Sequence, residues 1–446
     1  MKSITPILAL LIFVFNSCLV ADHPFPAIAP GIWRAVLKLD PEFITPNPRG
    51  EPLPEKLNMK FEEVTQGELP FTFEVKYNPD QTFYLEIING DERIKVDDIS
   101  MGREKRSARD TILIRFPEYD SYIRVYSEGN VMQGEWVVAS KKDYRIPFLA
   151  KHGQGHRFTT LQKPPAADLS GKWEVTMETE TDHPFKAIGE FVQQGNYLKG
   201  TFLTETGDHR FLEGTVQANK AYLSCFDGSH AFLYEAKILE DGTLIGSFRS
   251  GTHYKTLWEA KRNPDFQLAN PDQLTFLKPG YEKFSFAFKN SEGKIISLDD
   301  PAYRNKVKII QLMGTWCPNC MDETHFLLNY LKENPNPDLV VIGLAFERYD
   351  DPAKAMNAIR TYKKRLSIPY EVLHAGSSNK EKAALALPML NQVLSYPTTI
   401  YIDRNDQVRR IHTGFSGPAT SQYEAFKTDF QSFVSNLLAE AHSNKQ

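Results

Sequence analysis

The stretch Gly314-Thr315-Trp316-Cys317-Pro318-Asn319-Cys320 constrains the fold of this chain more than any other. An apolar run leads into it and apolar residues at helical spacing follow it, so we expect a buried strand that turns into a helix at the cysteines. The residues that carry this pattern are Val307, Ile309, Ile310, Leu312 and Met313 before the motif, and Met321, Leu328 and Leu331 after it.

A cysteine at the start of a helix is expected to have a reactive sulfur. Unpaired backbone N–H groups and the positive end of the helix dipole favour a thiolate over a thiol, so Cys317 is expected to be the attacking cysteine. Two intervening residues, one of them the rigid Pro318, bring Cys320 within bonding distance, so Cys320 is expected to resolve a mixed disulfide with a partner.

A zinc site is the alternative use of such a pair, with His325 as a third ligand. Zinc ribbons need a second Cys-x-x-Cys or a histidine pair. The chain has 4 cysteines, and the other two, Cys18 and Cys225, lie far away in sequence. We therefore predict a redox pair without metal, and a buried, inert thiol at Cys225.

A second motif, Tyr396-Pro397-Thr398-Thr399, lies about 75 residues after Cys320 and precedes a strand that ends at Asp403. The order strand, Trp-Cys-Pro-x-Cys, helix and Tyr-Pro-Thr resembles the thioredoxin-like thiol-disulfide oxidoreductases of the TlpA and ResA type. The resemblance covers about the last third to two fifths of the chain. It implies an α/β thioredoxin-like domain over residues 281–446, with a central sheet flanked by helices.

The resemblance also implies substrate-binding residues. Pro397 would be a cis proline that faces the cysteines and leaves the backbone of Tyr396 free to pair with an extended substrate segment. The simpler alternative is a trans proline that begins a strand. Trp316 is expected to shield Cys317 and, together with Pro318, to contact a partner protein.

Glu347 is the candidate proton carrier. It follows the buried strand 339–345, where proteins of the TlpA and ResA type often carry an acidic residue near the buried cysteine. A partly desolvated carboxyl there would have a raised pKa and could take up the proton of Cys320. The alternative is a surface glutamate, with Asp350 or Asp351 in that role. Glu323 is expected to stabilise the start of the helix.

The N-terminus predicts export. Lys2 precedes the apolar run 7–15, as in a signal peptide over residues 1–21. Cleavage before Cys18 would give a lipid-anchored protein, whereas cleavage before Asp22 would release an unmodified one. The formal net charge of -4 gives no reason to expect nucleic acid as a partner. We therefore predict an extracytoplasmic protein in the periplasm or on a membrane.

Residues 22–163 and 164–262 predict two all-β regions of short strands and turns. Three pairs of segments recur in the same order, which indicates an internal duplication into two barrel-like or sandwich-like repeats or one larger structure. The large aromatic side chains are expected to fill cores rather than form a ligand platform. The paired segments are Gly31-Ile32-Trp33 with Gly171-Lys172-Trp173, Gly90–Arg93 with Gly207–Arg210, and Arg115-Phe116 with Cys225-Phe226.

The proline-rich stretch 263–280 predicts a linker to the third region. Beyond it, the continuous apolar run 339–345 predicts a strand buried in a mostly parallel sheet. The pattern also predicts a helix from about 380 to 393, and Gly414 is expected to let the backbone approach the active site closely.

These patterns predict an extracytoplasmic enzyme that reduces protein disulfides through Cys317 and Cys320 and is recharged by a membrane electron donor, without a bound cofactor. Oxidation or isomerisation would use the same residues. A thiol peroxidase is one alternative, although peroxidatic sites usually carry Thr and Pro just before the cysteine. A binding lipoprotein whose thioredoxin-like domain senses redox state is another.

Overall fold

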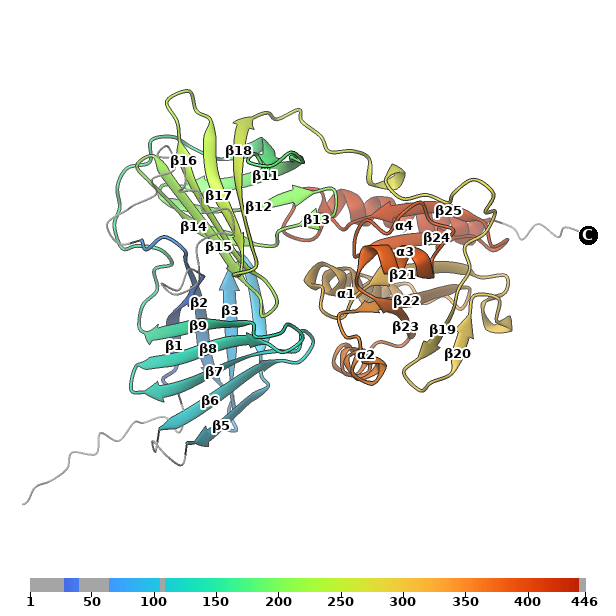
Figure 1. Cartoon of the computed structure of the whole chain (residues 1–446), viewed down its shortest axis with the longest axis horizontal. Coiled ribbons are helices and arrows are strands. Elements are labelled where there is room, and N and C mark those ends of the chain that lie inside the picture. Colours follow the sequence, from blue (N-terminus) through green and yellow to red (C-terminus); the bar gives the residue numbers. More distant parts are fainter. Residues whose placement is uncertain (1–27, 40–63, 105–108, 441–446) are drawn as a thin grey trace, which may run out of the picture.

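The computed structural model describes residues 28–39, 64–104 and 109–440. The predicted signal peptide and Cys18 lie outside these ranges. The described residues form two antiparallel β-sheets followed by a mixed α/β domain (Figure 1). None of the helices in these ranges is long and apolar enough to cross a membrane.

The first sheet is an open, curved antiparallel sheet in the order β4-β3-β2-β1-β9-β8-β7-β6-β5. The first strand therefore pairs with both the second and the ninth, and strands β4 and β5 form the two edges. Its strands are β1 (Gly31–Lys38), β2 (Glu68–Tyr77), β3 (Phe83–Asn89), β4 (Glu92–Val96), β5 (Ile99–Arg103), β6 (Asp110–Phe116), β7 (Ser121–Glu128), β8 (Val131–Val138) and β9 (Arg145–His152).

The second sheet has the same strand order but closes into a barrel, because β11 pairs with β12 as well as with β10. The order is β11-β10-β18-β17-β16-β15-β14-β12-β13, in which β13 is a short addition beside β12. Its strands are β10 (Gly171–Met177), β11 (Phe185–Gln194), β12 (Tyr197–Thr204), β13 (Gly207–Asp208), β14 (Leu212–Gln217), β15 (Lys220–Phe226), β16 (Ala231–Ile238), β17 (Leu244–Ser250) and β18 (Tyr254–Arg262).

The open sheet packs its concave face on the outside of the barrel. Strand β15 is buried on both sides: Cys225 points into the barrel core, whereas Tyr222 and Phe226 belong to the core of the first sheet. Phe226 stacks on Phe71 with ring centroids 4.4 Å apart and meets Trp136 edge-on at 5.1 Å. The two β-sheets therefore form one packed unit, which we call the β region.

The sequence prediction that large aromatic side chains fill cores is confirmed. Cys225 is buried as predicted, and burial raises the pKa of its thiol. The aromatic residues singled out from the sequence are all buried: Trp33, Trp136, Trp173, Tyr222, Phe232, Tyr234 and Trp258.

The C-terminal domain has a sheet in the order β20-β19-β23-β22-β21-β24-β25. Among neighbouring strands only the pairs β21–β22 and β22–β23 are parallel, and the other pairs are antiparallel. The sheet is therefore mixed rather than mostly parallel as expected. The buried run 339–345 does lie between two parallel neighbours, which explains its continuous apolar pattern. The strands are β19 (Ala287–Asn290), β20 (Ile295–Ser297), β21 (Val307–Met313), β22 (Leu339–Glu347), β23 (Glu371–Ser377), β24 (Thr398–Ile402) and β25 (Val408–Thr413).

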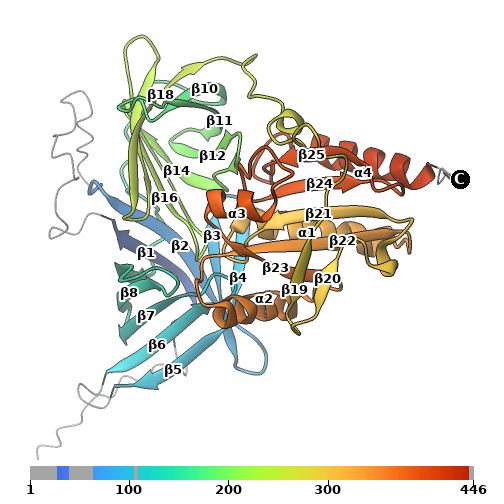
Figure 2. The same cartoon turned by 45° about the vertical axis from the view of Figure 1, so that its right-hand side comes forward.

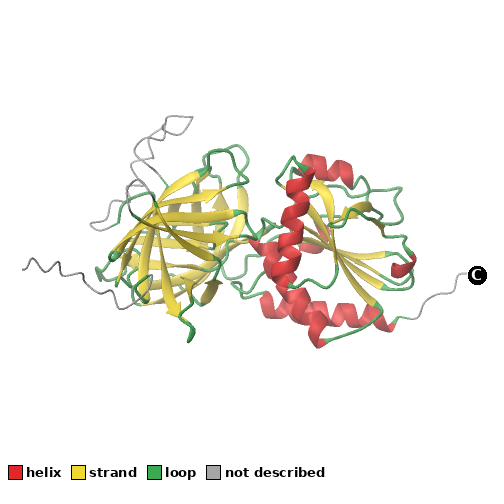
Figure 3. Cartoon of the chain, turned by 90° about the horizontal axis from the view of Figure 1, so that it is seen from below, coloured by secondary structure: helices red, strands yellow, loops and turns green. Residues whose placement is uncertain are grey.

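Helices cover both faces of this sheet (Figure 3). One core joins side chains of α1 and α4, and the other contains side chains of α2 and α3. The third helix ends at Ala386, so the predicted continuation to residue 393 is wrong; Leu387 closes the helix and the chain then continues without helical structure. The helices are α1 (Pro318–Glu333), α2 (Pro352–Leu366), α3 (Lys380–Ala386) and α4 (Tyr423–Ala439).

The segment 263–280, expected to be a linker, connects the barrel to the C-terminal domain and contacts that domain. A short 3-10 helix, η2 (Pro271–Gln273), lies beside β25. There Asp272 Oδ1 lies 2.7 Å from His412 Nδ1. Both β-sheets lie on the same side of the C-terminal domain (Figure 2).

Candidate active site

The two cysteines lie at the junction of β21 and α1, as the apolar pattern predicted. Cys317 is the N-cap of α1, with extended backbone, and Pro318 occupies the first helical turn. A disulfide joins Cys317 to Cys320 across a Cα–Cα distance of 5.2 Å. The backbone N–H of Cys320 points at Cys317 Sγ from 3.2 Å. The helix start therefore presents an N–H donor to the sulfur that would carry negative charge after reduction.

The Tyr396–Pro397 peptide is cis, as predicted. Cys317 Sγ lies 3.4 Å from the carbonyl oxygen of Tyr396, so this loop faces the disulfide directly. Both cysteines are largely shielded: Cys317 is 6% exposed and Cys320 is fully buried.

Trp316, the residue before Cys317, is held on three sides. Its indole N–H donates to the carbonyl of Phe346 at 2.9 Å. The guanidinium of Arg348 lies 4.0 Å above its ring, and the ring of Tyr396 meets it edge-on at 5.8 Å. The side chain is thereby fixed in place beside Cys317.

Glu347 is buried at the end of β22 and is not a surface residue. Its two oxygens accept hydrogen bonds from the N–H and the hydroxyl of Thr315, two residues before Cys317. Burial raises the pKa of Glu347 to about 7, although the bonds from Thr315 act in the opposite direction. Glu347 also lines a cavity of about 510 Å³ together with Thr315, Trp316 and Arg348, which gives the carboxyl a path for proton exchange.

Glu323 was expected to stabilise the start of the helix, and in the structure it forms hydrogen bonds to two strands of the sheet. It is buried one turn after Cys320, and it accepts hydrogen bonds from Thr399 Oγ1 at 2.6 Å and Gln311 Nε2 at 2.8 Å. Gln311 Nε2 also donates to the carbonyl of Cys320 at 3.2 Å. Burial raises the pKa of Glu323. The signal for this cluster was Gln311, a polar residue inside an otherwise apolar buried strand.

The start of α1 also contacts the β region. No sequence pattern predicted this contact. The contacting residues surround the two cysteines in sequence. The contacts are Ser229 Oγ to Trp316 O (3.1 Å), Arg210 to Pro318 O (3.4 Å), Asn319 Nδ2 to Asp208 O (3.0 Å), Tyr119 Oη to Met321 Sδ (3.4 Å) and Arg210 to Asp322.

Arg210 is the centre of a buried charge network between the two parts of the molecule. It pairs with Glu92 at 2.5 Å, with Asp227 at 3.6 Å and with Asp322. Burial raises the pKa of Asp322 to about 7, while the nearby Arg210 lowers it. One guanidinium thus faces three carboxyl groups, two from the β region and one from α1.

Across residues 28–39, 64–104 and 109–440, no group of three or more His, Cys, Asp or Glu side chains is arranged to hold a metal ion. His325 lines a separate cavity of about 360 Å³ beside Met321 and Asp322.

Comparison with known proteins identifies the C-terminal part. Residues 262–426 match the family model described as Redoxin. The match covers less than half of the chain and does not describe the β region. No curated protein matches the chain.

Solved structures with similarity to this part share low sequence identity. One is a thiol:disulfide interchange protein of the thioredoxin family from Chlorobium tepidum TLS, 21% identical, covering 35% of this chain and 96% of that one, with a TM-score of 0.28. Another is a putative protein disulfide isomerase from Bacteroides thetaiotaomicron, 19% identical, covering 38% and 94%, with a TM-score of 0.28. A third is a DsbF homologue from Corynebacterium diphtheriae, 18% identical, covering 37% and 98%, with a TM-score of 0.28.

Residues 262–426 match the Redoxin model and lie within the mixed α/β part of the chain, which we call the redoxin domain. Its two cysteines are joined by a disulfide, and the β region precedes this domain in the same chain.

Proposed function

We propose that this protein is an extracytoplasmic thiol-disulfide oxidoreductase that reduces disulfides in other proteins. The observation that carries the proposal is the Cys317–Cys320 pair at the start of α1, with Cys317 Sγ 3.4 Å from the backbone carbonyl of Tyr396. Thiol-disulfide exchange with an extended polypeptide requires an attacking sulfur beside backbone groups that can pair with that polypeptide.

In the proposed reaction the reduced enzyme carries two thiols. The Cys317 thiolate attacks a substrate disulfide, which forms a mixed disulfide and releases one substrate thiolate. The Cys320 thiolate then attacks Cys317 Sγ, which releases the second substrate thiolate and forms the Cys317–Cys320 disulfide. Two electrons and two protons from an external dithiol donor, which we propose is membrane-bound, restore the enzyme.

Glu347 is the proposed acceptor of the Cys320 proton. Its burial, its raised pKa near 7 and its fixed position on Thr315 support this role. Glu323 is also buried, but Glu347 lines a cavity of about 510 Å³, and a proton carrier has to exchange its proton with solvent.

Trapping tests the function. The Cys320→Ala variant retains the attacking sulfur and lacks the resolving one, so it should accumulate mixed disulfides at Cys317 with extracytoplasmic proteins. The Cys317→Ala variant is the matched control, because it also loses one cysteine and keeps Cys225. If Cys320→Ala captures no more protein than Cys317→Ala, also when both are combined with a substitution that separates the β region from the redoxin domain, the proposal is wrong.

The direction of electron flow is tested by equilibration with glutathione. A reductant should have a potential near that of thioredoxin, about −270 mV, whereas a value near −120 mV would identify an oxidant. Consumption of hydrogen peroxide by the reduced protein would instead support a peroxidase.

Export and lipid attachment at Cys18 are also proposals, supported by the apolar run 7–15 and by the cysteine that follows it. Fractionation of cells that express the chain or its Cys18→Ser variant tests them. Membrane association that is lost in the variant supports lipidation, and equal association in both overturns it.

The β region is proposed to derive from duplication of one nine-stranded unit. The two sheets share their strand order. Each first strand carries a tryptophan whose indole N–H donates to a carbonyl four residues earlier at 2.9 Å, from Trp33 to Ala29 and from Trp173 to Leu169. Phe116 and Phe226 end the corresponding strands β6 and β15.

A further inference from the structure

One loop of the barrel lies directly on the face of the redoxin domain that carries the disulfide. This loop, residues 205–210, follows β12 and includes the short strand β13; we call it the occluding loop. It contacts three loops of the redoxin domain: the Cys-x-x-Cys turn, the loop before Pro397 and the loop 414–417.

The occluding loop is held through its backbone, as a bound polypeptide would be. Ser395 Oγ, beside Tyr396, donates to the carbonyl of Thr206 at 2.7 Å. Asn319, between the two cysteines, donates its side-chain amide to the carbonyl of Asp208 at 3.0 Å. Bonds to main-chain carbonyls do not depend on side-chain identity, so an extended segment of another protein could accept the same bonds.

The fit around Gly207 is tight. Gly207 has a φ of +135°, and a Cβ there would lie 2.6 Å from Asn319 Nδ2. On the other side, a Cβ at Gly414 would lie 3.1 Å from the Glu205 carbonyl oxygen. Gly414 therefore lets the backbone approach the occluding loop, and its N–H donates to the carbonyl of Pro397 at 2.9 Å, so it lies close to the active-site loop as expected.

Further contacts enclose the same face. The backbone N–H of Gly417 donates to Asp208 Oδ2 at 2.7 Å. Ser229, on the next barrel loop, donates to the carbonyl of Trp316 at 3.1 Å. In this docked arrangement Cys317 is only 6% exposed.

We propose that this arrangement is a self-blocked state of the enzyme, in which the occluding loop takes the place of an extended polypeptide substrate. A protein disulfide reaches Cys317 only after the β region has moved away from the redoxin domain. The inference rests on the proposed function, and it assigns regulation of that site to the chain's own β region.

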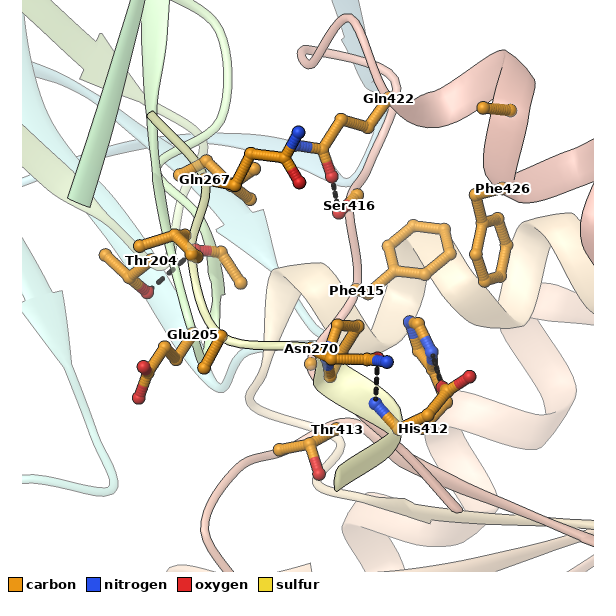
Figure 4. A pocket seen from close by; sticks show the side chains of 18 of the residues that line it. Thr204, Glu205, Gln267, Asn270, His412, Thr413, Phe415, Ser416, Gln422 and Phe426 are labelled. Carbon is orange, nitrogen blue, oxygen red and sulfur yellow. Dashed lines mark hydrogen bonds and ion pairs between the residues drawn. The ribbon is translucent and has the colours of Figure 1, made fainter. Parts of the chain in front are cut away.

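The contacts between the β region and the redoxin domain allow the two parts to separate. Its contacts with the disulfide face are mostly polar, and water can replace each of them when the parts separate. A cavity of about 650 Å³ lies between the turn at Thr204–Glu205, the segment 267–272 and the loop 412–416, so the two parts are incompletely packed there (Figure 4). The segment 263–280 tethers the parts after separation.

Size-dependent alkylation of the reduced full-length chain tests the proposal. N-ethylmaleimide and a 5-kDa polyethylene glycol maleimide react with the same thiolate but differ in size. The rate at Cys317 is read by mass spectrometry in the Cys320→Ala background, because Cys317 and Cys320 lie in the same peptide; the readout also separates Cys317 from Cys18 and Cys225. In the blocked state we expect the large reagent to react at least about tenfold more slowly than the small one, relative to the same ratio in unfolded protein.

The Gly207→Ala variant should remove this difference, because its Cβ would lie 2.6 Å from Asn319 Nδ2 and force the Asn319 amide out of its docked position, and because a side chain at a φ of +135° strains the loop. Gly242→Ala is the matched control, since Gly242 also has a positive φ, +81°, and a Cβ there would have no neighbour within 4 Å. Ser229→Ala is a second, milder variant, which should reduce the difference without a change in backbone conformation.

Three results together support the blocked state. Gly207→Ala loses the size discrimination, Ser229→Ala shows less of it, and Gly242→Ala retains it. Equal relative rates of both reagents in the unmodified chain overturn it, as does discrimination that persists unchanged in both variants. Because the blocked state would itself keep partner proteins from Cys317, trapping is repeated with Cys320→Ala in the Gly207→Ala background. A chain that discriminates by size but traps nothing in that opened background would refute the proposed function and leave the blocked state standing.

Discussion

The carboxylate of Glu347 accepts two hydrogen bonds from Thr315, one from its backbone N–H at 3.0 Å and one from its hydroxyl at 2.9 Å. This pairing ties the end of β22 to the segment that leads into Cys317. It also holds a carboxyl with a pKa near 7 in a fixed position beside the redox site. A group with that pKa changes charge near neutral pH.

Glu347→Gln should slow the release of reduced substrate by about 10²-fold near neutral pH, the usual contribution of a positioned proton acceptor. In the unmodified enzyme this step should become faster as pH rises through about 7, because the carboxyl is then ionised and can accept a proton. The variant should lack this component of the pH–rate profile. Single-turnover kinetics with a disulfide substrate from pH 5 to 9 provides the measurement.

Two comparison variants make the result specific. Glu282→Gln changes an exposed carboxyl of the same domain and should keep the profile of the unmodified enzyme. Glu323→Gln changes the other buried carboxyl. If Glu323→Gln lacks the component of the pH–rate profile near pH 7 and Glu347→Gln retains it, Glu323 rather than Glu347 is the proton acceptor.

Glu347 should also make the fold less stable as pH rises. Its pKa is raised from 4.5 to about 7 in the folded state, so between these values the unfolded chain loses the proton while the folded chain keeps it. Stability should therefore fall from pH 4.5 to 7, by up to about 3 kcal/mol from this group, and level off above that. Urea unfolding of the unmodified chain and Glu347→Gln at several pH values isolates the contribution, and parallel curves would contradict it.

Arg210→Leu should destabilise the docked structure by about 3–5 kcal/mol at pH 7, because it leaves three buried carboxyls without their cation. The loss should shrink as pH falls below about 7, because burial raises the pKa of Asp322 to about 7 and its protonated carboxyl no longer needs the cation. Adding Asp322→Leu should recover part of it. Arg93→Leu, at an exposed neighbour, should change stability by about 0.5 kcal/mol or less. Equal effects of Arg210→Leu at pH 4 and pH 7 would rule out this explanation.

Phe430→Ala should cost about 3–5 kcal/mol, because it opens a cavity in the core between α1, α4 and the sheet. The Phe430 ring is 1% exposed, and its centroid lies 4.8 Å from that of Phe326 and 4.9 Å from that of Tyr330. Leu385→Ala, at an 81% exposed position, is the control and should have little effect. Thermal or urea unfolding measures both.

The local order of the redoxin domain could be predicted from sequence because it follows from local patterns. The apolar run before Cys317 predicted the strand β21, and the apolar run 339–345 predicted a strand that does lie between parallel neighbours. The third helix was predicted too long, because apolar residues at helical spacing continue beyond Ala386 and pack without helical backbone.

Contacts between distant segments could not be predicted in the same way. Glu323 becomes a buried hydrogen-bonded group only because Gln311 and Thr399 from two neighbouring strands converge on it. The sequence equally carries no sign that Asp208 would meet Asn319, since neither residue type marks an interface. Such pairings depend on where the β region docks.

The sequence by itself determined the redox pair, because two cysteines at the start of a helix follow from spacing along a single strand–helix unit. The proline loop opposite them and the carboxyl nearby were implied by the resemblance to a known family. Only the tertiary structure decided that the barrel closes while the first sheet stays open, and that the barrel's loop 205–210 contacts the turn between the two cysteines. Those outcomes depend on contacts between segments that are distant in sequence and meet only after the chain has folded, so no local pattern encodes them.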